Sequence, residues 1–292
     1  MEKIIVTPAG RRKFLSILAG YLIRYYETDE FDEWHLWCNT DIKEDIDYIY
    51  WLEREYDFIK VIPLGSNADI QKYSHVNGII HQGSEMIHAC TISYFIPVDT
   101  IDEDAVYLRL DDDILFIKDG SIKKLFDYRL NNRENFLVYG NIVNNSAIAY
   151  IHQQIGVLPK TLGEVKFDAH DPLSLYSGGF CEASHNNFFE KYKTNSLDEY
   201  KFPPFVLTDY TRISIQVISW WGSDYKKFDG IIQQSVHEEL FQSVTRPEME
   251  GRTNVVFGDG LFCHYSAGMT VAHMHTTDIL LKYQALADEY LI

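Results

Sequence analysis

The chain contains few cysteines, and their spacing does not match a disulfide framework or a zinc site. Four are present in 292 residues, at Cys38, Cys90, Cys181 and Cys263, and none forms a Cys-x-x-Cys pair. Small disulfide-stapled domains and zinc ribbons need closely spaced cysteines. We therefore expect free thiols buried in the core, which is typical of a cytoplasmic protein in a reducing compartment.

Long apolar runs and positive charge are also scarce. The most lipid-like stretch, residues 14–23, is too short to cross a bilayer. It follows three basic residues as a signal peptide would, but a strand-like run precedes it and no convincing cleavage site follows. Lys and Arg number 26 against 43 Asp and Glu, so the formal net charge is −17. Such a surface repels nucleic acid and anionic membranes, and we expect neither as a partner.

Linkers and glycine-rich phosphate loops are missing as well. No run rich in Pro, Gly or Ser divides the chain, and no internal repeat is visible. Neither Gly-x-Gly-x-x-Gly nor a Walker sequence occurs, which argues against a dehydrogenase or a phosphate-loop enzyme. With 46% hydrophobic and 14% aromatic residues, the chain can bury a sizeable core. We expect residues 1–292 to form a single domain.

Strand and helix signals alternate in the first third of the chain. Short β runs are predicted at residues 3–6, 34–38, 58–62 and 106–110, and helical periods at 14–25, 41–56 and 85–95. In the second half we predict strands at 136–139 and 258–265, the latter after a turn, a tight strand or turn at 177–180, and helices at 186–193 and 277–291. Such alternation predicts an α/β fold with a mainly parallel central sheet flanked by helices.

Three adjacent acids interrupt an apolar run in the segment VYLRLDDDILF, where Asp111, Asp112 and Asp113 follow the predicted strand 106–110. Neighbouring carboxylates repel one another, and burial worsens the repulsion. In an extended chain Asp111 and Asp113 point to one side and Asp112 to the other. Ligands of parallel sheets bind beyond the carboxyl ends of the strands, so the pair predicts a Mg²⁺ or Mn²⁺ site. A solvated acidic turn is the alternative.

The segment YLRLDDDILFI (residues 107–117) resembles the metal-binding Asp-x-Asp segment of glycosyltransferases with the GT-A fold. GDGLFCHYSAG (residues 258–268) resembles the late segment in which such enzymes place a metal-binding histidine, and His264 is the matching position. GNIVNN (140–145) and SIQVISWWGSDYKKFDG (214–230) are similar to segments of bacterial and viral members.

The resemblance implies a GT-A-like α/β domain with a metal-dependent transferase activity. A sugar would move from a nucleotide-sugar, a UDP-sugar first and a GDP-sugar next, to a glycan or other hydroxyl acceptor. Residues 1–113 would bind the donor and residues 114–292 the acceptor. Asp111, Asp113 and His264 would hold Mn²⁺ or Mg²⁺, and the imidazole nitrogen makes Mn²⁺ as suitable as Mg²⁺.

Candidate donor-binding residues surround the predicted metal site. The loop TPAGRR places Thr7 and Arg11 at the start of the nucleotide pocket that the resemblance implies, where a helix N-terminus also favours anions. Arg109 shares a face with the paired acids and can contact either a phosphate or an acid. Asp112 can bind backbone groups or a ribose hydroxyl. Gly179, in YSGGF, allows close backbone approach to the donor sugar, although an ordinary bend explains it equally well.

An inverting transferase needs a base for the acceptor hydroxyl, whereas a retaining enzyme does not. Glu238 and Glu239 are the first candidates and Asp224 is the next, although acids also stabilise helix N-termini. Trp220 and Trp221 are candidates for an acceptor groove, and the alternative places both in the core.

Two other classes of protein fit parts of this pattern. A Mg²⁺-dependent nucleotidyltransferase or phosphohydrolase also pairs acids around a cation, and a non-catalytic nucleotide- or carbohydrate-binding protein would use the acids structurally.

Overall fold

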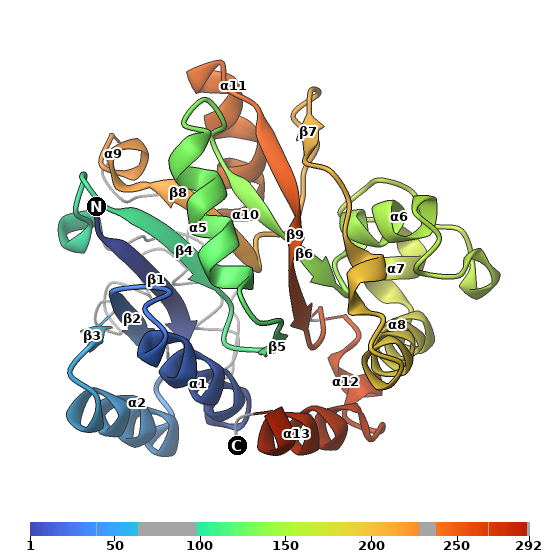
Figure 1. The fold of residues 1–292 in the computed structure, drawn as a ribbon, viewed down its shortest axis with the longest axis horizontal. Helices are drawn as coiled ribbons and strands as arrows, with labels where there is room; N and C mark the ends of the chain where they lie inside the picture. Colours follow the sequence, from blue (N-terminus) through green and yellow to red (C-terminus); the bar gives the residue numbers. More distant parts are fainter. Residues whose placement is uncertain (39, 64–97, 228–237, 268, 291–292) are drawn as a thin grey trace, which may run out of the picture.

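The computed structural model describes residues 1–38, 40–63, 98–227, 238–267 and 269–290 (Figure 1). Within these residues nine strands form one sheet, in the order β3-β2-β1-β4-β8-β6-β9-β5, with β7 pairing to β9. The strands are β1 (Lys3–Ala9), β2 (Glu33–Cys38), β3 (Ile59–Pro63), β4 (Val106–Leu110), β5 (Ile114–Ile117), β6 (Val138–Val143), β7 (Phe205–Leu207), β8 (Val217–Trp221) and β9 (Asn254–His264).

The directions of the strands confirm the predicted α/β class. β1 to β4 run parallel to one another. β8 is antiparallel to both β4 and β6, so β6 and its parallel neighbour β9 point the same way as β4. β5 and β7 are antiparallel to β9. Six of the nine described strands therefore share one direction, which is the mainly parallel sheet expected of a GT-A-like chain.

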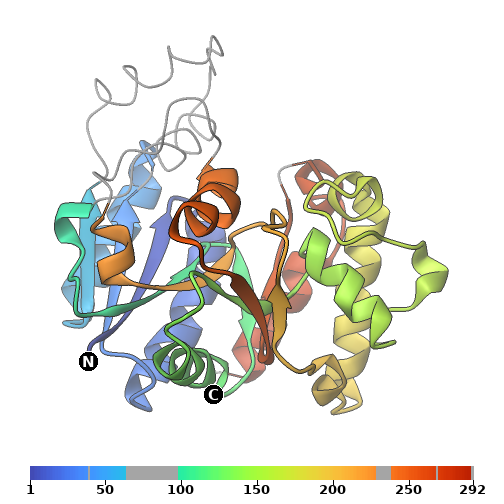
Figure 2. The ribbon, with the colours of Figure 1, turned by 90° about the horizontal axis from the view of Figure 1, so that it is seen from above.

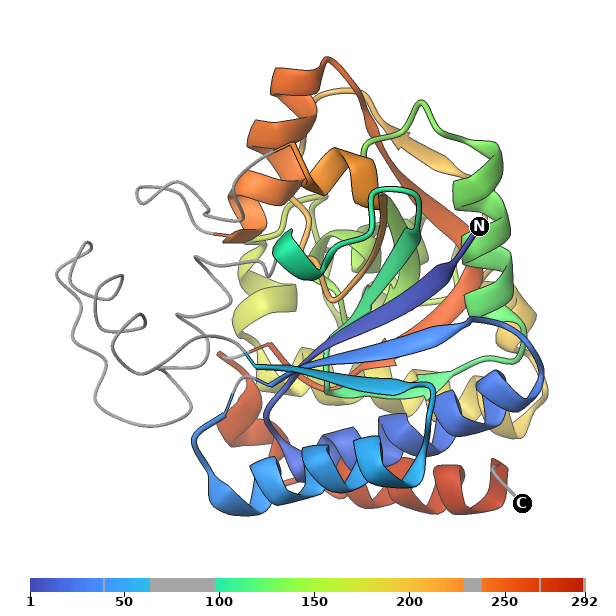
Figure 3. The same ribbon diagram turned by 90° about the vertical axis from the view of Figure 1, so that its left-hand side faces the viewer.

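Helices flank the sheet. They are α1 (Arg12–Glu27), α2 (Lys43–Glu55), α5 (Ser121–Asn131), α6 (Ser146–Gln154), α7 (Pro172–Tyr176), α8 (Gly178–Lys193), α9 (Gly222–Tyr225), α10 (Glu238–Leu240), α11 (Arg246–Glu250), α12 (Val271–Met274) and α13 (Ile279–Tyr290). α1, α2 and α13 lie side by side along one side of the molecule (Figures 1 and 3). α6, α7 and α8 gather beside β6 and β9 (Figure 2).

The first helix illustrates how the sequence pattern determines the packing. Phe14, Leu18, Leu22 and Tyr25 recur at helical spacing, and all four are buried on one side of α1. Burying each such side chain contributes about 1.5–3 kcal/mol. These residues belong to one large core that also takes side chains from the strands of both halves of the chain.

The structure corrects two predictions in which glycine was taken as a sign of a turn. Gly178 and Gly179 lie in the first turn of α8, because Ser177 caps that helix by accepting a hydrogen bond from the Phe180 N–H at 3.2 Å. The predicted turn at 258 is part of the continuous strand β9. Glycine is needed at Gly258 because a Cβ there would lie 2.1 Å from a backbone oxygen of residue 202.

Three remaining expectations concern helices and cysteines. The helix predicted at 85–95 lies outside the described residues. Of the helices that the structure describes, none is both long enough and apolar enough to cross a membrane. Cys38, Cys181 and Cys263 are free thiols, and Cys90 lies outside the described part of the chain.

Candidate metal site

The three acids form the link between β4 and β5 at the carboxyl end of β4. β4 and β5 are not neighbours, because β8, β6 and β9 lie between them in the sheet. The link therefore passes across the ends of these strands, and Ile114 of β5 pairs opposite His264 at the end of β9. This topology brings the acids beside a histidine that is far away in the sequence.

Asp111, Asp113 and His264 form the acid–His cluster. One ligand atom from each residue lies within 4.8 Å of the others. The side chains of Asp113 and His264 are 1% and 5% exposed, whereas that of Asp111 is 24% exposed. The cluster is thus enclosed on two sides and open at Asp111, where a substrate oxygen can approach.

Asp113 has the environment of a metal ligand. Both of its carboxylate oxygens are buried, and neither accepts a hydrogen bond from any residue that the structure describes. Its neighbours are Arg11 Nη2 at 3.2 Å and His264 Nε2 at 3.3 Å from Oδ1. Burial raises the pKa of Asp113, but these two groups more than offset it and hold the pKa below its usual range. Arg11 offsets part of the cost of burying this ionised carboxylate, and the two oxygens, which accept no hydrogen bond within the described chain, can also bind a divalent cation.

The ring of His264 is oriented by its second nitrogen. Nδ1 lies 3.4 Å from the backbone oxygen of Asn144, and a carbonyl oxygen can only accept. Nε2 lies 3.3 Å from Asp113 Oδ1, which can also only accept, so the ring is held between two oxygen acceptors with Nε2 facing the acids. Burial lowers the pKa of His264, but Asp113 and Asp111 raise it further, so a metal ion must compete with a proton. Two carboxylates and one imidazole fit Mn²⁺ or Mg²⁺.

The side chain of Asp112 faces the start of α1, and the Arg11 Nη2 that contacts it also lies 3.2 Å from Asp113 Oδ1. Its Oδ2 accepts hydrogen bonds from the backbone N–H groups of Gly10 (3.1 Å) and Arg11 (2.9 Å), and its Oδ1 accepts from Arg11 Nε (3.0 Å). The amino end of α1, which we expected to be open to a donor phosphate, is therefore occupied by this carboxylate. Arg11 keeps a side chain that is 37% exposed at the edge of the cluster.

Arg109 contacts acids, which was one of the two alternatives for it. Its Nε donates to Asp111 Oδ1 at 3.1 Å and its Nη1 to Glu238 Oε1 at 2.5 Å. Gln242 Nε2 donates to the same Glu238 oxygen at 2.8 Å, and the Tyr225 hydroxyl donates to Gln242. Burial raises the pKa of Glu238 to about 7. Glu238 is buried and bound to Arg109, so the structure does not present it as a base for an acceptor.

The other two acid candidates also pair with arginines. Glu239 pairs with Arg212 and is half-buried. Asp224 is nearly buried, and its Oδ1 pairs with Arg252 at 2.7 Å. β8 runs antiparallel to β4, so Asp224, just beyond β8, lies near the start of β4 and the cluster near its end. β4 has five residues, which is roughly 15 Å of strand.

The two tryptophans belong to the core, which was the alternative to an acceptor groove. Trp220 and Trp221 are 1% and 4% exposed. Trp220 stacks between Tyr107 and Tyr225, with ring centroids 5.6 and 4.5 Å away. Trp221 lies opposite Val106, at the far end of β4 from the acids. The acceptor role is therefore not supported for either residue.

Of the remaining donor candidates, Thr7 is corrected by the structure. It lies inside β1, fully buried, and its hydroxyl accepts a hydrogen bond from the Trp34 indole at 3.0 Å. Gly179 is exposed in the first turn of α8. That turn is held close to the cluster, because Cys181 Sγ donates to the backbone oxygen of Tyr265, the residue after His264, at 3.7 Å.

The sequence analysis missed a group of basic side chains beside the cluster. Lys13 Nζ lies 3.3 Å from His275 Nε2, and the His275 ring stacks on Tyr265. We call Arg11, Lys13 and His275 the basic rim. The run of three basic residues at 11–13 was the only signal for it, and nothing in the sequence placed His275 opposite. On a chain of net charge −17, a basic rim next to acids suits a phosphate group.

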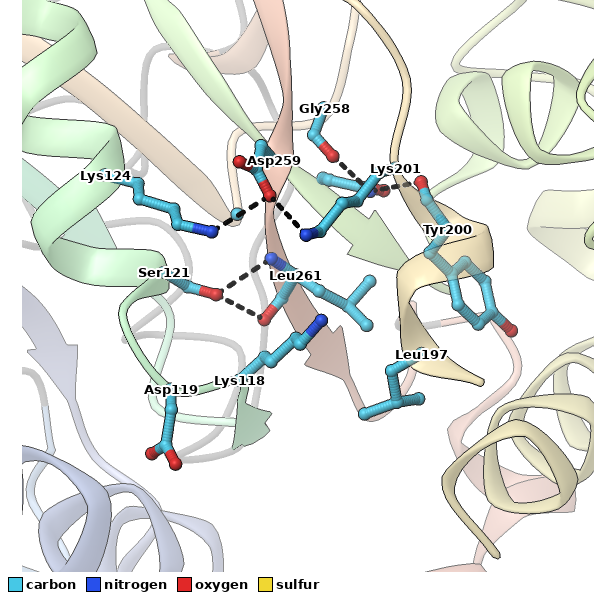
Figure 4. Close-up of a pocket in the computed structure, with 12 residues that line it drawn as sticks. Lys118, Asp119, Ser121, Lys124, Leu197, Tyr200, Lys201, Gly258, Asp259 and Leu261 are labelled. Carbon is cyan, nitrogen blue, oxygen red and sulfur yellow. Dashed lines mark hydrogen bonds and ion pairs between the residues drawn. The ribbon is translucent and has the colours of Figure 1, made fainter. Parts of the chain in front are cut away.

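Two other hollows of the described surface do not resemble a nucleotide site. Figure 4 shows Lys124 and Lys201 both directed at Asp259, next to a cavity of only about 10 Å³. A groove of about 640 Å³ lies between the ends of α1 and α2, but Glu27, Glu53, Glu55 and Asp57 line it. The first is about the size of one water molecule, and the second repels phosphate.

Comparison with known proteins assigns no family. No family model matches the chain, and no curated protein sequence matches it. Among solved structures, the crystal structure of a 4-diphosphocytidyl-2C-methyl-D-erythritol synthase from Anaerococcus prevotii matches with 15% sequence identity. The match covers 96% of this chain and 95% of that chain, with a TM-score of 0.37. What the fold and site define is an α/β protein with a candidate divalent-metal site.

Proposed function

We propose that this protein is a divalent-metal-dependent transferase that acts on a nucleotide-activated donor. The observation that carries the proposal is the pair of buried Asp113 oxygens, which no described residue hydrogen-bonds, beside the Nε2 of His264. A bound Mn²⁺ or Mg²⁺ would stabilise the negative charge that develops on the departing phosphates. It would also let an acidic protein bind a doubly anionic donor.

The chain's own residues take distinct parts in this function. Arg109 holds Asp111, the most exposed ligand of the cluster, by donating to its carboxylate. Arg11 Nη2 lies 3.2 Å from Asp113 Oδ1, and Lys13 and His275, whose ring stacks on Tyr265, would join it in contacting donor phosphates bound at the cluster. Gly179 offers backbone at the open first turn of α8. In this assignment the donor binds mainly to residues 1–113, and the acceptor to residues 114–292.

Glycosyl transfer is the first form of the proposal. The sequence resemblance favours it, with UDP-sugars before GDP-sugars as donors and a glycan or other hydroxyl as acceptor. The loop between β1 and α1 adds support, because Asp112 already binds the N–H groups of Gly10 and Arg11. That loop does not offer the open backbone donors of a triphosphate-binding loop. All three candidate acids pair with arginines, and in an inverting mechanism Glu239 is the candidate base because its side chain is more exposed than those of Glu238 and Asp224.

Nucleotidyl transfer is the second candidate. The basic rim supports it, because three basic groups beside two acids suit the longer chain of phosphates in a nucleoside triphosphate. In this reaction the acceptor attacks the α-phosphate and pyrophosphate leaves. In glycosyl transfer the acceptor attacks the sugar carbon and a nucleoside diphosphate leaves.

The products distinguish the two forms. Purified protein is incubated with panels of nucleotide-sugars and nucleoside triphosphates, with Mn²⁺ or Mg²⁺ and mixed hydroxyl acceptors. Release of a nucleoside diphosphate indicates glycosyl transfer, and release of pyrophosphate indicates nucleotidyl transfer. Thermal melts with nucleoside diphosphates and triphosphates are the parallel measurement, because ligand binding raises the apparent stability. Product release or nucleotide-induced thermal stabilisation that does not depend on the metal would contradict the proposal.

A further inference from the structure

Two consecutive asparagines lie between the segments that carry the acid–His cluster. Asn144 and Asn145 follow Val143, the last residue of β6. In the sheet, β6 has β9 on one side and β8 on the other (Figure 1). β9 ends at His264, and β8 lies next to β4, which leads into Asp111. The pair is thus placed to contact both parts of the cluster.

Asn144 is bound to the end of β9. Its side-chain Nδ2 donates to the backbone oxygens of His264 (3.2 Å) and Tyr265 (3.0 Å). Its own backbone oxygen accepts from His264 Nδ1 at 3.4 Å. The backbone of Asn144 has a φ of 66°, in the left-handed region that glycine and asparagine tolerate best. Residues held in that region often mark a functional constraint.

Asn145 is bound to the other side. Its Nδ2 donates to Gln216 Oε1 at 2.7 Å and to the backbone oxygen of Ser214 at 3.2 Å. The backbone oxygen of Gln216 in turn accepts the N–H of Asp111 at 2.9 Å. The same asparagine caps α6, since its Oδ1 accepts from the Ile148 N–H at 3.1 Å. Asn145 therefore fixes the segment to which the backbone of Asp111 is attached.

We propose that the Asn144–Asn145 pair positions the acid–His cluster for metal binding, a role that rests on the proposed function. Asn144 holds the end of β9 through the backbone oxygens of His264 and Tyr265, and its own backbone oxygen faces His264 Nδ1. It therefore sets where the ring places Nε2 relative to Asp113 Oδ1, 3.3 Å away. Asn145 holds the backbone at Asp111, so the two side chains together set the separation of the ligands.

Metal affinity is the first test. Asn144→Gly removes the amide and tolerates the left-handed backbone, and Asn145→Ser keeps a capping oxygen but loses the amide donors. Asn195→Gly is the matched control, because Asn195 also has a positive φ (53°) and lies beyond α8 on the surface. Free Mn²⁺ is measured by electron paramagnetic resonance during titration. We expect both variants of the pair to bind Mn²⁺ about 10–100-fold more weakly and the control to be unchanged. Wild-type affinity in both variants would overturn the proposal.

The position of the His264 ring is the second test, and it needs no metal. In crystal structures of the metal-free protein, we expect the separation of His264 Nε2 from Asp113 Oδ1, 3.3 Å in the wild type, to change in Asn144→Gly and to stay the same in Asn195→Gly. An unmoved ring in Asn144→Gly would overturn the positioning role of Asn144. If the ring moves but the wild type binds no Mn²⁺, the proposed metal function fails while the positioning role of Asn144 stands.

Discussion

At the scale of single residues, neighbouring carboxylates in one short segment have opposite surroundings. Asp113 faces His264 with two oxygens that accept no hydrogen bond within the described chain, whereas Asp112 accepts four from Gly10 and Arg11. The first environment suits a metal ligand and the second suits a helix cap. The same substitution at each position should therefore have different consequences.

We expect Asp113→Asn to abolish the Mn²⁺-dependent stabilisation by nucleoside diphosphates while the fold is retained. Asp112→Asn is the matched control, and it should keep the apparent Mn²⁺ affinity within about tenfold, or about 1.4 kcal/mol. Asp112→Asn should instead lower the free energy of unfolding by about 1 kcal/mol, because the negative charge at the start of α1 is lost. Mn²⁺ titrations and urea denaturation of both variants measure this. Equal losses of Mn²⁺ affinity would show that Asp112 is also a ligand.

Asp111 and Asp113 come together as predicted, but the acids lie in a turn that the Ile114 N–H closes on the Asp111 backbone oxygen at 3.1 Å, so strand alternation does not continue through them. The sequence did not predict the partners of the other acids. Glu238 opens a helix, and nothing nearby in the sequence reveals that it is bound to Arg109, 129 residues away. The rest of the candidate site follows from long-range strand pairing, which residue spacing does not encode. Asn144 lies in the segment GNIVNN. Its contact with His264 depends on the pairing of β6 with β9, which the sequence did not predict.

At the scale of elements, α6 and α8 each contain a buried histidine that the fold keeps neutral. His152 Nε2 of α6 donates a hydrogen bond to Asn141 Oδ1 at 2.7 Å, and burial lowers the pKa of His152 to about 3. His185 of α8 joins the Tyr283 hydroxyl (2.8 Å) and the backbone oxygen of Tyr265 (2.9 Å), and burial lowers its pKa to about 4. Both helices are thereby sensitive to acid.

We expect the free energy of unfolding to fall as the pH drops from about 6.5 toward 4 and then 3. The folded-state pKa of each histidine lies below its unfolded value. The unfolded chain therefore takes up protons first, and the stabilisation present above pH 6.5 is lost. The loss is on the order of 5 kcal/mol for His152 and 3 kcal/mol for His185. Urea denaturation across this range measures it, with His152→Gln as the comparison. If the free energy of unfolding of His152→Gln depends on pH as that of the wild type does, the acid sensitivity does not come from His152.

Elements whose apolar periods are strong were predicted well, and those that contain glycine were not. α1 and the strands β2 and β4 were found where the sequence predicted them. α8 was missed at its start because Gly178 and Gly179 suggested a turn, although the Ser177 cap outweighed them. In β9, Gly258 marks the close approach of another backbone segment, a tertiary requirement that the local sequence does not reveal.

At the scale of the whole molecule, an excess of negative charge surrounds a small basic rim. We expect Lys13→Gln and His275→Gln to weaken the binding of a nucleoside diphosphate and to reduce its dependence on salt concentration, because each removes one phosphate contact. Mn²⁺ affinity should be unchanged, since neither residue belongs to the cluster. Lys123→Gln is the control, because Lys123 is exposed on α5 and pairs only with Asp127 among the described acids. Calorimetric titration at several salt concentrations measures this. An equal effect of the control would show that the contribution comes from net charge alone.

The position of β8 between β4 and β6 has a consequence for how the protein emerges from the ribosome. β4 ends at Leu110, but the strand that pairs with its free edge begins only at Val217, opposite that residue. A nascent chain that has made β1 to β4 therefore presents an unpaired strand edge through much of its synthesis, and such edges promote association with other chains. We expect residues 1–113, expressed alone, to aggregate in light-scattering measurements and to bind no Mn²⁺, although they contain both acids. A monomeric fragment that binds Mn²⁺ would show that the first half folds without β8 and β9.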